Sequence, residues 1–280
     1  DPVDGLGDPV DGLKDPASGP LLDLRDVTKS YRRRGRHRKP VVDRISLAIG
    51  VGELVALVGE SGSGKSTIGK IVAGLLYADS GTVRVAGQDY PTAVSEAIPR
   101  LTRAQRRSVQ MVFQDSYSSL NPRRTVRDSI VAPLVAGRAS RAEADTRLRE
   151  VTDLAGLATD LLDRYPSQLS GGQRQRVAIA RALVLDPGLI VADEAISALD
   201  VTAQQELIEM IRVLKTESRT SFLFITHDLG VARHLADRVV VLSPDGIQDT
   251  GTPAEVFQHP RSAYTRALID AVPRITTRAS

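Results

Sequence analysis

The segment GESGSGKST, residues 59–67, constrains the fold of this chain more than any other stretch. It follows ELVALV, an apolar run typical of a buried strand, and it opens a run with the composition of a helix, residues 64–76. The segment fits G-x-x-x-x-G-K-[ST], whose glycines let the backbone wrap around phosphate groups. We therefore predict a nucleotide phosphate site between a strand and a helix. The residues expected to contact the nucleotide here are Gly59, Ser61, Gly62, Ser63, Gly64, Lys65, Ser66 and Thr67.

Each polar side chain of this segment suggests a specific task. We expect Lys65 to bring its charge to the β- and γ-phosphates, and the Ser66 hydroxyl to bind magnesium.

A second apolar run, LIVADE, ends in Asp193 and Glu194. Ligands lie at the carboxyl ends of parallel strands, so Asp193 is expected to hold the magnesium and Glu194 to position the attacking water. The sequence has no Asn-Lys-x-Asp motif, which argues against a GTPase.

A second anion-binding helix start lies in LSGGQRQRVAIARAL, residues 169–183. Ser170, Gly171 and Gly172 precede a run with helical spacing from Gln173 onward. The free N–H groups and the positive end of the helix dipole make such a start an anion site. These residues alone do not explain why one chain would carry two such sites.

Apolar strand-like and amphipathic helix-like segments alternate from residue 21 onward, with a clearly helical section at about 116–168. This order favours an α/β fold in which helices cover a mostly parallel sheet. Residues 1–20 contain the repeat DPVDGLG–DPVDGLK, whose Asp-Pro and Asp-Gly pairs are typical of turns. We interpret them as a flexible linker or tail, and their origin in a longer chain stays open.

Composition excludes several classes of site. Because the chain has no cysteine, disulfides and thiolate metal sites are excluded. No apolar run approaches the ~18–20 residues that a membrane-spanning helix needs. The net charge of +3 is too small to indicate nucleic-acid binding by itself. The basic run YRRRGRHRK, residues 31–39, fits a solvated loop or a contact with anionic lipid or RNA, and both interpretations stay open.

The ordered series GESGSGKST, VFQD, LSGGQRQR, LIVADE, SALD and ITHD resembles the nucleotide-binding subunit of an ATP-binding cassette (ABC) transporter. The resemblance implies a P-loop NTPase (RecA-like) core with a mostly parallel sheet, an antiparallel β subdomain and an inserted α-helical subdomain at about 116–168. It places an ATPase domain at 21–250 and a short C-terminal extension at 251–280. The implied activity is ATP hydrolysis, with ATP and Mg²⁺ as cofactors.

The same resemblance implies roles for residues outside the phosphate segment. Tyr31 resembles the aromatic residue that stacks on adenine. Gln114 resembles the glutamine that touches magnesium or the attacking water, and His227 resembles the histidine that contacts the γ-phosphate and the catalytic glutamate, here Glu194. Asp200 resembles an aspartate that crosses a dimer interface, although it would also serve as the cap of the next helix.

The resemblance also offers a reason for the second helix start. In this family the LSGGQ segment closes over the ATP held by a second ATPase domain. A homologous subunit, a fused half or a second copy of this chain would supply that domain. The residues implied to act in trans are Ser170, Gly171, Gly172, Gln173 and Asp200.

Two longer segments, QDSYSSLNPRRTV (114–126) and GTPAEVFQHPRSAYTRALIDAVP (251–273), resemble the branch that powers oligopeptide, dipeptide, glutathione and nickel import. This branch implies two multi-spanning permease subunits, an extracytoplasmic substrate-binding protein, and a location at the cytoplasmic face of the cell (inner) membrane. HPRSAYTRAL departs from the commoner His-Pro-Tyr-Thr arrangement, which leaves its contacts open. The alternative is a non-transport ABC ATPase acting on nucleic acid or the ribosome, which only the basic run supports. The substrate and the composition of the ATPase pair stay open.

Overall fold

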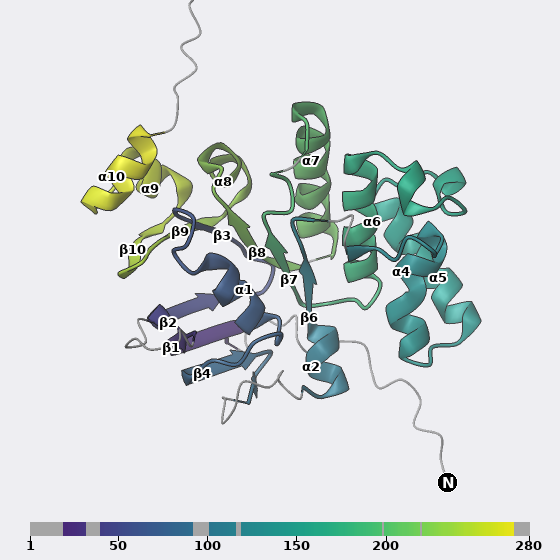
Figure 1. Ribbon diagram of the computed structural model, residues 1–280, viewed down its shortest axis with the longest axis horizontal. Helices are drawn as coiled ribbons and strands as arrows, with labels where there is room; N and C mark the ends of the chain where they lie inside the picture. The colour runs from purple at the N-terminus through teal and green to yellow at the C-terminus, as the bar shows by residue number, and fades with distance from the viewer. Residues whose placement is uncertain are drawn as a thin grey trace, which may run out of the picture.

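The computed structural model describes residues 19–31, 40–91, 101–115, 119–197, 199–218 and 220–271. Within these ranges the chain forms two sheets, and most of the helices lie around the larger one (Figure 1). The predicted linker up to residue 18, the basic run at 32–39 and residues 272–280 of the extension lie outside the described residues.

The smaller sheet is antiparallel, as expected for the β subdomain. Its strands, in spatial order, are β2 (Pro40–Ile49), β1 (Leu22–Ser30), β4 (Ser80–Val85) and β5 (Gln88–Asp89). Ile45, Leu47 and Ile49 of β2 are buried and alternate with exposed neighbours, which is the pattern of a sheet with one covered face.

The larger sheet contains both strands predicted from the apolar runs ELVALV and LIVADE, which are β3 and β7. The strands of this sheet, in spatial order, are β10 (Gly246–Gly251), β9 (Arg238–Ser243), β3 (Leu54–Val58), β8 (Ser221–Thr226), β7 (Leu189–Asp193) and β6 (Val109–Val112). All neighbours pair in parallel except β10, which runs antiparallel to β9. β3, β7 and β8 are buried along their whole length, because helices cover both faces of the sheet.

Helix α1 (Lys65–Val72) lies between the two sheets (Figure 1). Its close approach to the larger sheet depends on Gly69. A Cβ at this position would lie 2.7 Å from Cδ1 of Ile225 and 3.1 Å from Cγ1 of Val191. One buried apolar cluster therefore joins α1 to both sheets and fixes the start of α1 relative to the strand ends.

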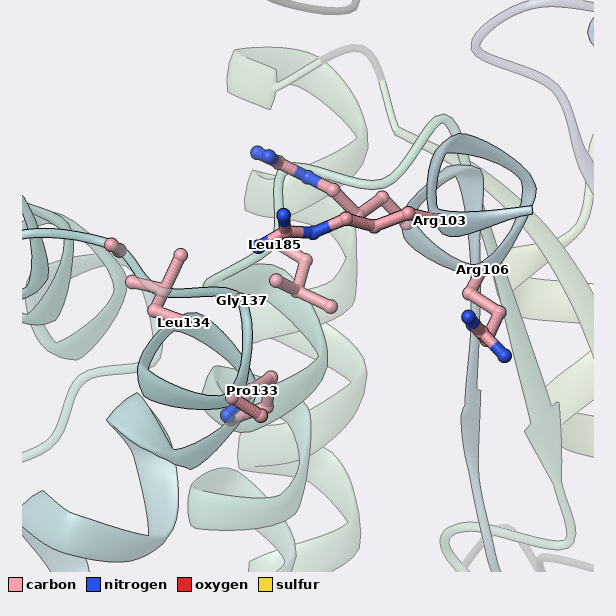
Figure 2. A pocket seen from close by; sticks show the side chains of 9 residues that line it. Arg103, Arg106, Pro133, Leu134, Gly137 and Leu185 are labelled. Atoms are coloured by element: carbon pink, nitrogen blue, oxygen red, sulfur yellow. The ribbon is translucent and has the colours of Figure 1, made fainter. Parts of the chain in front are cut away.

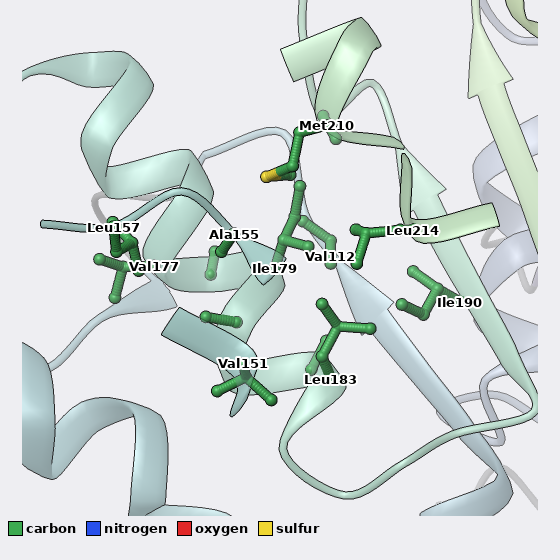
Figure 3. Close-up of a cluster of buried hydrophobic side chains, with 14 of the residues drawn as sticks. Val112, Val151, Ala155, Leu157, Val177, Ile179, Leu183, Ile190, Met210 and Leu214 are labelled. Atoms are coloured by element: carbon green, nitrogen blue, oxygen red, sulfur yellow. The ribbon is translucent and has the colours of Figure 1, made fainter. Parts of the chain in front are cut away.

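A group of helices packs on the β6 side of the larger sheet (Figure 1). It contains α4 (Val126–Ala136), α5 (Arg141–Leu154), the short 3-10 turns η3 (Thr159–Leu161) and η4 (Pro166–Gln168), and α6 (Gly171–Leu183). Val151, Val177 and Leu183 belong to one buried cluster (Figure 3). α6 contacts α4 and α5 as well as β6 and α7, so it connects this group to the sheet, beyond the expected limit at 168. The division into subdomains stays a prediction.

The remaining helices are α2 (Arg103–Ser108), α7 (Val201–Ser218), α8 (Leu229–Leu235), α9 (Pro253–Gln258) and α10 (Ala263–Asp270). α2, α8 and the hairpin strand β10 are short, and no prediction was made for them from the sequence. None of the helices in the described part of the chain combines the length and hydropathy that a membrane crossing requires.

Replacing Leu148 by alanine tests the helical packing. Its side chain is 1% exposed in the cluster beneath α4, α5 and α6. We expect the free energy of unfolding to fall by ~2–5 kcal/mol, because a cavity replaces buried methyl groups. Calorimetric unfolding measures the change, and Leu75→Ala is the matched control, since Leu75 is 45% exposed. Equal shifts for the two variants would contradict the packing described here.

Candidate active site

Parallel pairing brings the predicted chemistry to one edge of the larger sheet. β3 pairs with β8, β8 with β7, and β7 with β6. At their carboxyl ends, β3 is followed by Gly59, β8 by His227 and β7 by Glu194. Gln114 lies two residues beyond the end of β6. Residues that lie far apart in the sequence therefore meet at the edge where α/β sheets bind ligands.

The phosphate segment turns from β3 into α1 with its tip exposed. Ser61 and Gly62 are exposed, whereas Ser63 and Gly64 are buried. Gly64 has φ +100°, and a Cβ there would lie 2.7 Å from the carbonyl oxygen of Val41. Gly62 has φ +85°, and a Cβ there would meet nothing within 4 Å. The open side of Gly62 and the N–H groups at the start of α1 suit close approach of a phosphate.

The ammonium group of Lys65 is held by the segment's own backbone. The residue is 5% exposed, and its Nζ donates to the carbonyl oxygens of Gly59 at 2.8 Å and Glu60 at 2.7 Å. Its third contact, to Oγ of Ser63, is long at 3.5 Å. Because an ammonium group has three donors, the geometry fixes Lys65 and leaves one donor available to a phosphate.

Burial and nearby carboxylates act in opposite directions on the charges at this edge. Burial lowers the pKa of Lys65, and the carboxylates of Glu194, Asp193 and Glu60 act against that shift. Burial also raises the pKa of Asp193, while the hydrogen bond from Ser66 acts against it. Each group thus depends on an oppositely charged or hydrogen-bonding neighbour to keep its charge.

Ser66 and Asp193 form an oxygen-rich pair. The Ser66 hydroxyl donates to Oδ1 of Asp193 at 2.9 Å. Magnesium prefers oxygen ligands and usually keeps waters and phosphate oxygens beside one or two protein groups. The pair therefore fits magnesium held jointly with a nucleotide.

A hydrogen-bonded chain connects the other predicted catalytic residues. Nδ1 of His227 lies 3.3 Å from Oε1 of Glu194, whose backbone has the left-handed φ of 48°. The Ser197 hydroxyl donates to the Glu194 carbonyl oxygen at 3.0 Å and accepts from Nε2 of Gln114 at 3.2 Å. Ser197 lies in the quoted SALD motif, in which a role was predicted only for Asp200. Ser197 lies three residues after Glu194, and its N–H donates to the Glu194 carbonyl oxygen at 3.2 Å. This turn spacing is the sequence signal from which its role could have been predicted.

Tyr31 lies beside the first turn of α1. Its hydroxyl is 3.4 Å from Oγ1 of Thr67, and the residue is 48% exposed. An exposed ring next to the phosphate segment is compatible with the predicted stacking on a nucleotide base, which stays a prediction.

The residues predicted to act in trans form a separate group. Ser170 and Gln173 cap α6 reciprocally: the Gln173 N–H donates to Ser170 Oγ at 3.2 Å, and the Ser170 N–H donates to Gln173 Oε1 at 2.9 Å. Asp200 accepts from the Ala203 N–H at 2.9 Å and thus caps α7, the simpler role considered above. Figure 1 shows α6 well apart from α1, and no hydrogen bond among the described residues joins this group to residues 59–67.

The capping leaves the backbone at the start of α6 available. The N–H groups of Gly171 and Gly172 belong to the first turn and have no acceptor within the helix. A Cβ at Gly172 would lie 3.0 Å from Cβ of Ala203, whereas one at Gly171 would lie 3.5 Å from Cδ2 of Leu199. Gly172 is therefore tightly packed against α7 and Gly171 is not.

A cavity of about 430 Å³ lies away from this edge, between α2 and the end of α4 (Figure 2). Arginine side chains from α2 and apolar groups from α4 line it, among them Arg103, Arg106, Pro133 and Leu134. It shares no lining residue with the predicted catalytic or nucleotide-binding set.

The family model for ABC transporters matches residues 42–197. The chain belongs to this family. The family resemblance that the motifs indicated is thereby confirmed. The matched range includes the phosphate segment, Gln114, the start of α6 and the Asp193–Glu194 pair of this ABC protein.

Curated relatives cover most of this ABC protein. An oligopeptide transport ATP-binding protein, OppF, of Lactococcus lactis is 42% identical over 264 residues, 91% of this chain and 81% of that protein. A putative peptide import ATP-binding protein of Brucella abortus is 44% identical over 254 residues, 90% of this chain and 75% of that protein.

Solved cassettes share the fold. The dimeric ATP-binding cassette MJ0796, bound to ADP and Pi in a post-hydrolysis state, has a TM-score of 0.71 and 31% identity, covering 83% of this chain and 99% of that one. CbiO1 from Clostridium perfringens, part of the ABC transporter complex cbiONQ, has a TM-score of 0.74 and 25% identity, covering 86% and 91%. The predicted fold class is confirmed.

The two glycines of the phosphate segment provide a paired stability test. Gly64→Ala combines a left-handed backbone with a 2.7 Å clash against backbone, whereas Gly62→Ala meets open space. We expect Gly62→Ala to cost ~1–2 kcal/mol from backbone strain and Gly64→Ala to cost ~1–3 kcal/mol more from overpacking. Thermal unfolding without nucleotide measures both. A Gly64→Ala variant as stable as Gly62→Ala would show that the loop geometry is wrong.

Proposed function

We propose that this chain binds ATP with magnesium and hydrolyses it to energise an ABC importer of oligopeptides or dipeptides. The carrying observation is the shared edge at which the Lys65 ammonium, the Ser66–Asp193 pair and the Glu194–His227 pair converge. The peptide substrate is supported by the names of the relatives, which are 42% and 44% identical over nine-tenths of this chain.

Bound ATP with magnesium would supply the γ-phosphoryl group for transfer to water. Lys65, fixed by two backbone carbonyls, turns its remaining donor and its charge toward the phosphates. Ser66 and Asp193 are the proposed magnesium ligands, and Gln114 would add its amide oxygen while its nitrogen stays on Ser197. Tyr31 would stack on adenine beside the start of α1.

Glu194 is the proposed general base. A carboxylate one residue beyond a buried strand is held in place by its backbone, and it can accept a proton from a water. His227 contacts the same carboxylate and fixes its orientation, and Ser197 holds the Glu194 carbonyl while binding Gln114. A change at Gln114 is thereby passed to the backbone of the base through a single hydroxyl.

A second ABC ATPase domain completes each site in this proposal. The start of α6 and Asp200 lie apart from the chain's own phosphate segment, so their free N–H groups and charge are available to another subunit. The similar cassette MJ0796 with ADP and Pi is dimeric, which supports this arrangement. The partner domain would be a homologous subunit, a fused half or this chain itself.

Membrane attachment would be indirect. We propose that two multi-spanning permease subunits contact the surface from Gln114 to Pro122 and the adjacent helices, and that an extracytoplasmic binding protein delivers the substrate. The chain would then lie at the cytoplasmic face of the cell membrane. The nucleic-acid alternative has less support, because the relatives reported above are named as transport proteins and the basic run is its only basis.

Glu194→Gln tests the base assignment. The substitution keeps size and hydrogen bonding but removes the proton acceptor, so we expect ATP turnover to fall at least ~100-fold while ATP binding changes little. Phosphate release and equilibrium binding by the purified protein measure the two effects. Glu209→Gln on α7, where Glu209 is exposed and paired with Arg212, is the control that leaves turnover unchanged. Steady hydrolysis by Glu194→Gln would exclude this role.

A further inference from the structure

The C-terminal helices cover the part of the sheet that leads into the phosphate segment. Val58, the last residue of β3, belongs to a buried cluster with residues of β9, α8 and α9. The partly buried side chains of Phe257, Tyr264, Leu268 and Ile269 pack against that cluster. The extension is therefore in contact with the strand that holds the loop.

Asp249 fixes the beginning of α10. Its carboxylate accepts from the backbone N–H groups of Arg261 at 3.3 Å and Ser262 at 3.0 Å. Burial raises the pKa of Asp249, but hydrogen bonds from Thr265, Ser262 and Arg261 outweigh it and hold the pKa below its ordinary value. A charged, multiply bonded carboxylate thus joins β10 to α10.

Tyr264, in the second residue of α10, reaches the phosphate segment itself. Its hydroxyl accepts a hydrogen bond from the Glu60 N–H at 3.2 Å. The carbonyl of the same peptide group, that of Gly59, accepts from Nζ of Lys65 at 2.8 Å. One peptide group is therefore bonded at both ends, to the extension by its N–H and to the phosphate-binding lysine by its oxygen.

These two bonds depend on one orientation of the peptide. A rotation of the Gly59–Glu60 peptide plane would break both, and glycine at position 59 offers little resistance to rotation. Hydrogen bonds at opposite ends of one amide also polarise and strengthen each other. The Tyr264 hydroxyl thus fixes the orientation of the Gly59–Glu60 peptide, and with it the carbonyl oxygen that accepts from Lys65.

We propose that Tyr264 is a positioning residue that couples the C-terminal extension to nucleotide affinity through the Gly59–Glu60 peptide and Lys65. The proposal rests on the proposed function of Lys65 as a phosphate ligand. It assigns a task to the HPRSAYTRAL segment, in which Tyr264 is the tyrosine.

The test is Tyr264→Phe, which removes the hydroxyl and keeps the ring that packs against the cluster. In the nucleotide-free chain, hydrogen exchange of the Glu60 amide should accelerate about two- to tenfold, as expected for one lost hydrogen bond. The Kd of Mg–ADP, measured with a fluorescent ADP, should rise by a similar factor. The thermal unfolding midpoint should change little.

Tyr90→Phe is the matched control. The Tyr90 hydroxyl donates to the carbonyl oxygen of Gln105 at 3.3 Å, away from the phosphate segment, so the same chemical change should leave Glu60 exchange and the ADP Kd as in the wild type. Leu268→Ala loosens the packing of α10 without removing the Tyr264 hydroxyl. It shows how far the ADP Kd rises when the extension only loses stability, so the specific effect of the hydroxyl can be distinguished from a general structural one.

Wild-type Glu60 exchange and wild-type ADP affinity in Tyr264→Phe would overturn the proposal. A rise in Kd that only follows the loss of stability, as in Leu268→Ala, would also overturn it. Failure of the wild-type chain to bind ADP would instead contradict the proposed function.

Discussion

The register of the parallel strands β3, β8, β7 and β6 is the constraint on which the whole site depends. Because Asp193 of β7 pairs with Ile225 of β8, Glu194 comes close to His227 immediately beyond the strand ends. A slip of one residue would move one side chain by ~3.3 Å relative to the other, which is as long as their contact. The fully buried apolar runs of these strands therefore fix the distances between the proposed catalytic residues as well as the core.

The site itself contains a buried charge and a strained backbone, and the rest of the fold must offset their cost in stability. Lys65 is a buried charge stabilised by backbone carbonyls and by the carboxylates of Asp193 and Glu194. Glu194 has a left-handed backbone that residues other than glycine rarely adopt. Such strain persists only where the surrounding structure determines it, and here the large core joining both sheets and α1 supplies that support. The side chains proposed to bind phosphate and metal are thus already held in place by the chain's own contacts.

Local patterns predicted the features that short segments determine. The apolar runs of β3 and β7, the Gly-Lys-Ser turn into α1 and the Asp193–Glu194 pair followed from apolar patterns and motif spacing. Gln114 and His227 followed only from the family resemblance. Contacts between distant segments carried no such pattern. Ser197 is bonded to Gln114, and Tyr264 is bonded to Glu60 of the phosphate segment. The two residues of each pair lie far apart in the sequence, so no local pattern predicted either contact. α6 likewise joined the helical packing because of its tertiary contacts, which residue spacing at 116–168 did not reveal.

The central claim is that the loop before α6 serves the phosphate site of another subunit. Mixing two inactive variants tests it most directly: Lys65→Ala lacks the phosphate ligand, and Gly171→Glu adds a repelling charge at a helix start, where an acidic residue favours the helix and a Cβ fits. Each alone should be inactive under conditions in which the wild-type chain hydrolyses ATP. The mixture should recover a substantial fraction of wild-type turnover, because mixed pairs contain one intact composite site. A mixture as inactive as its components would contradict the account.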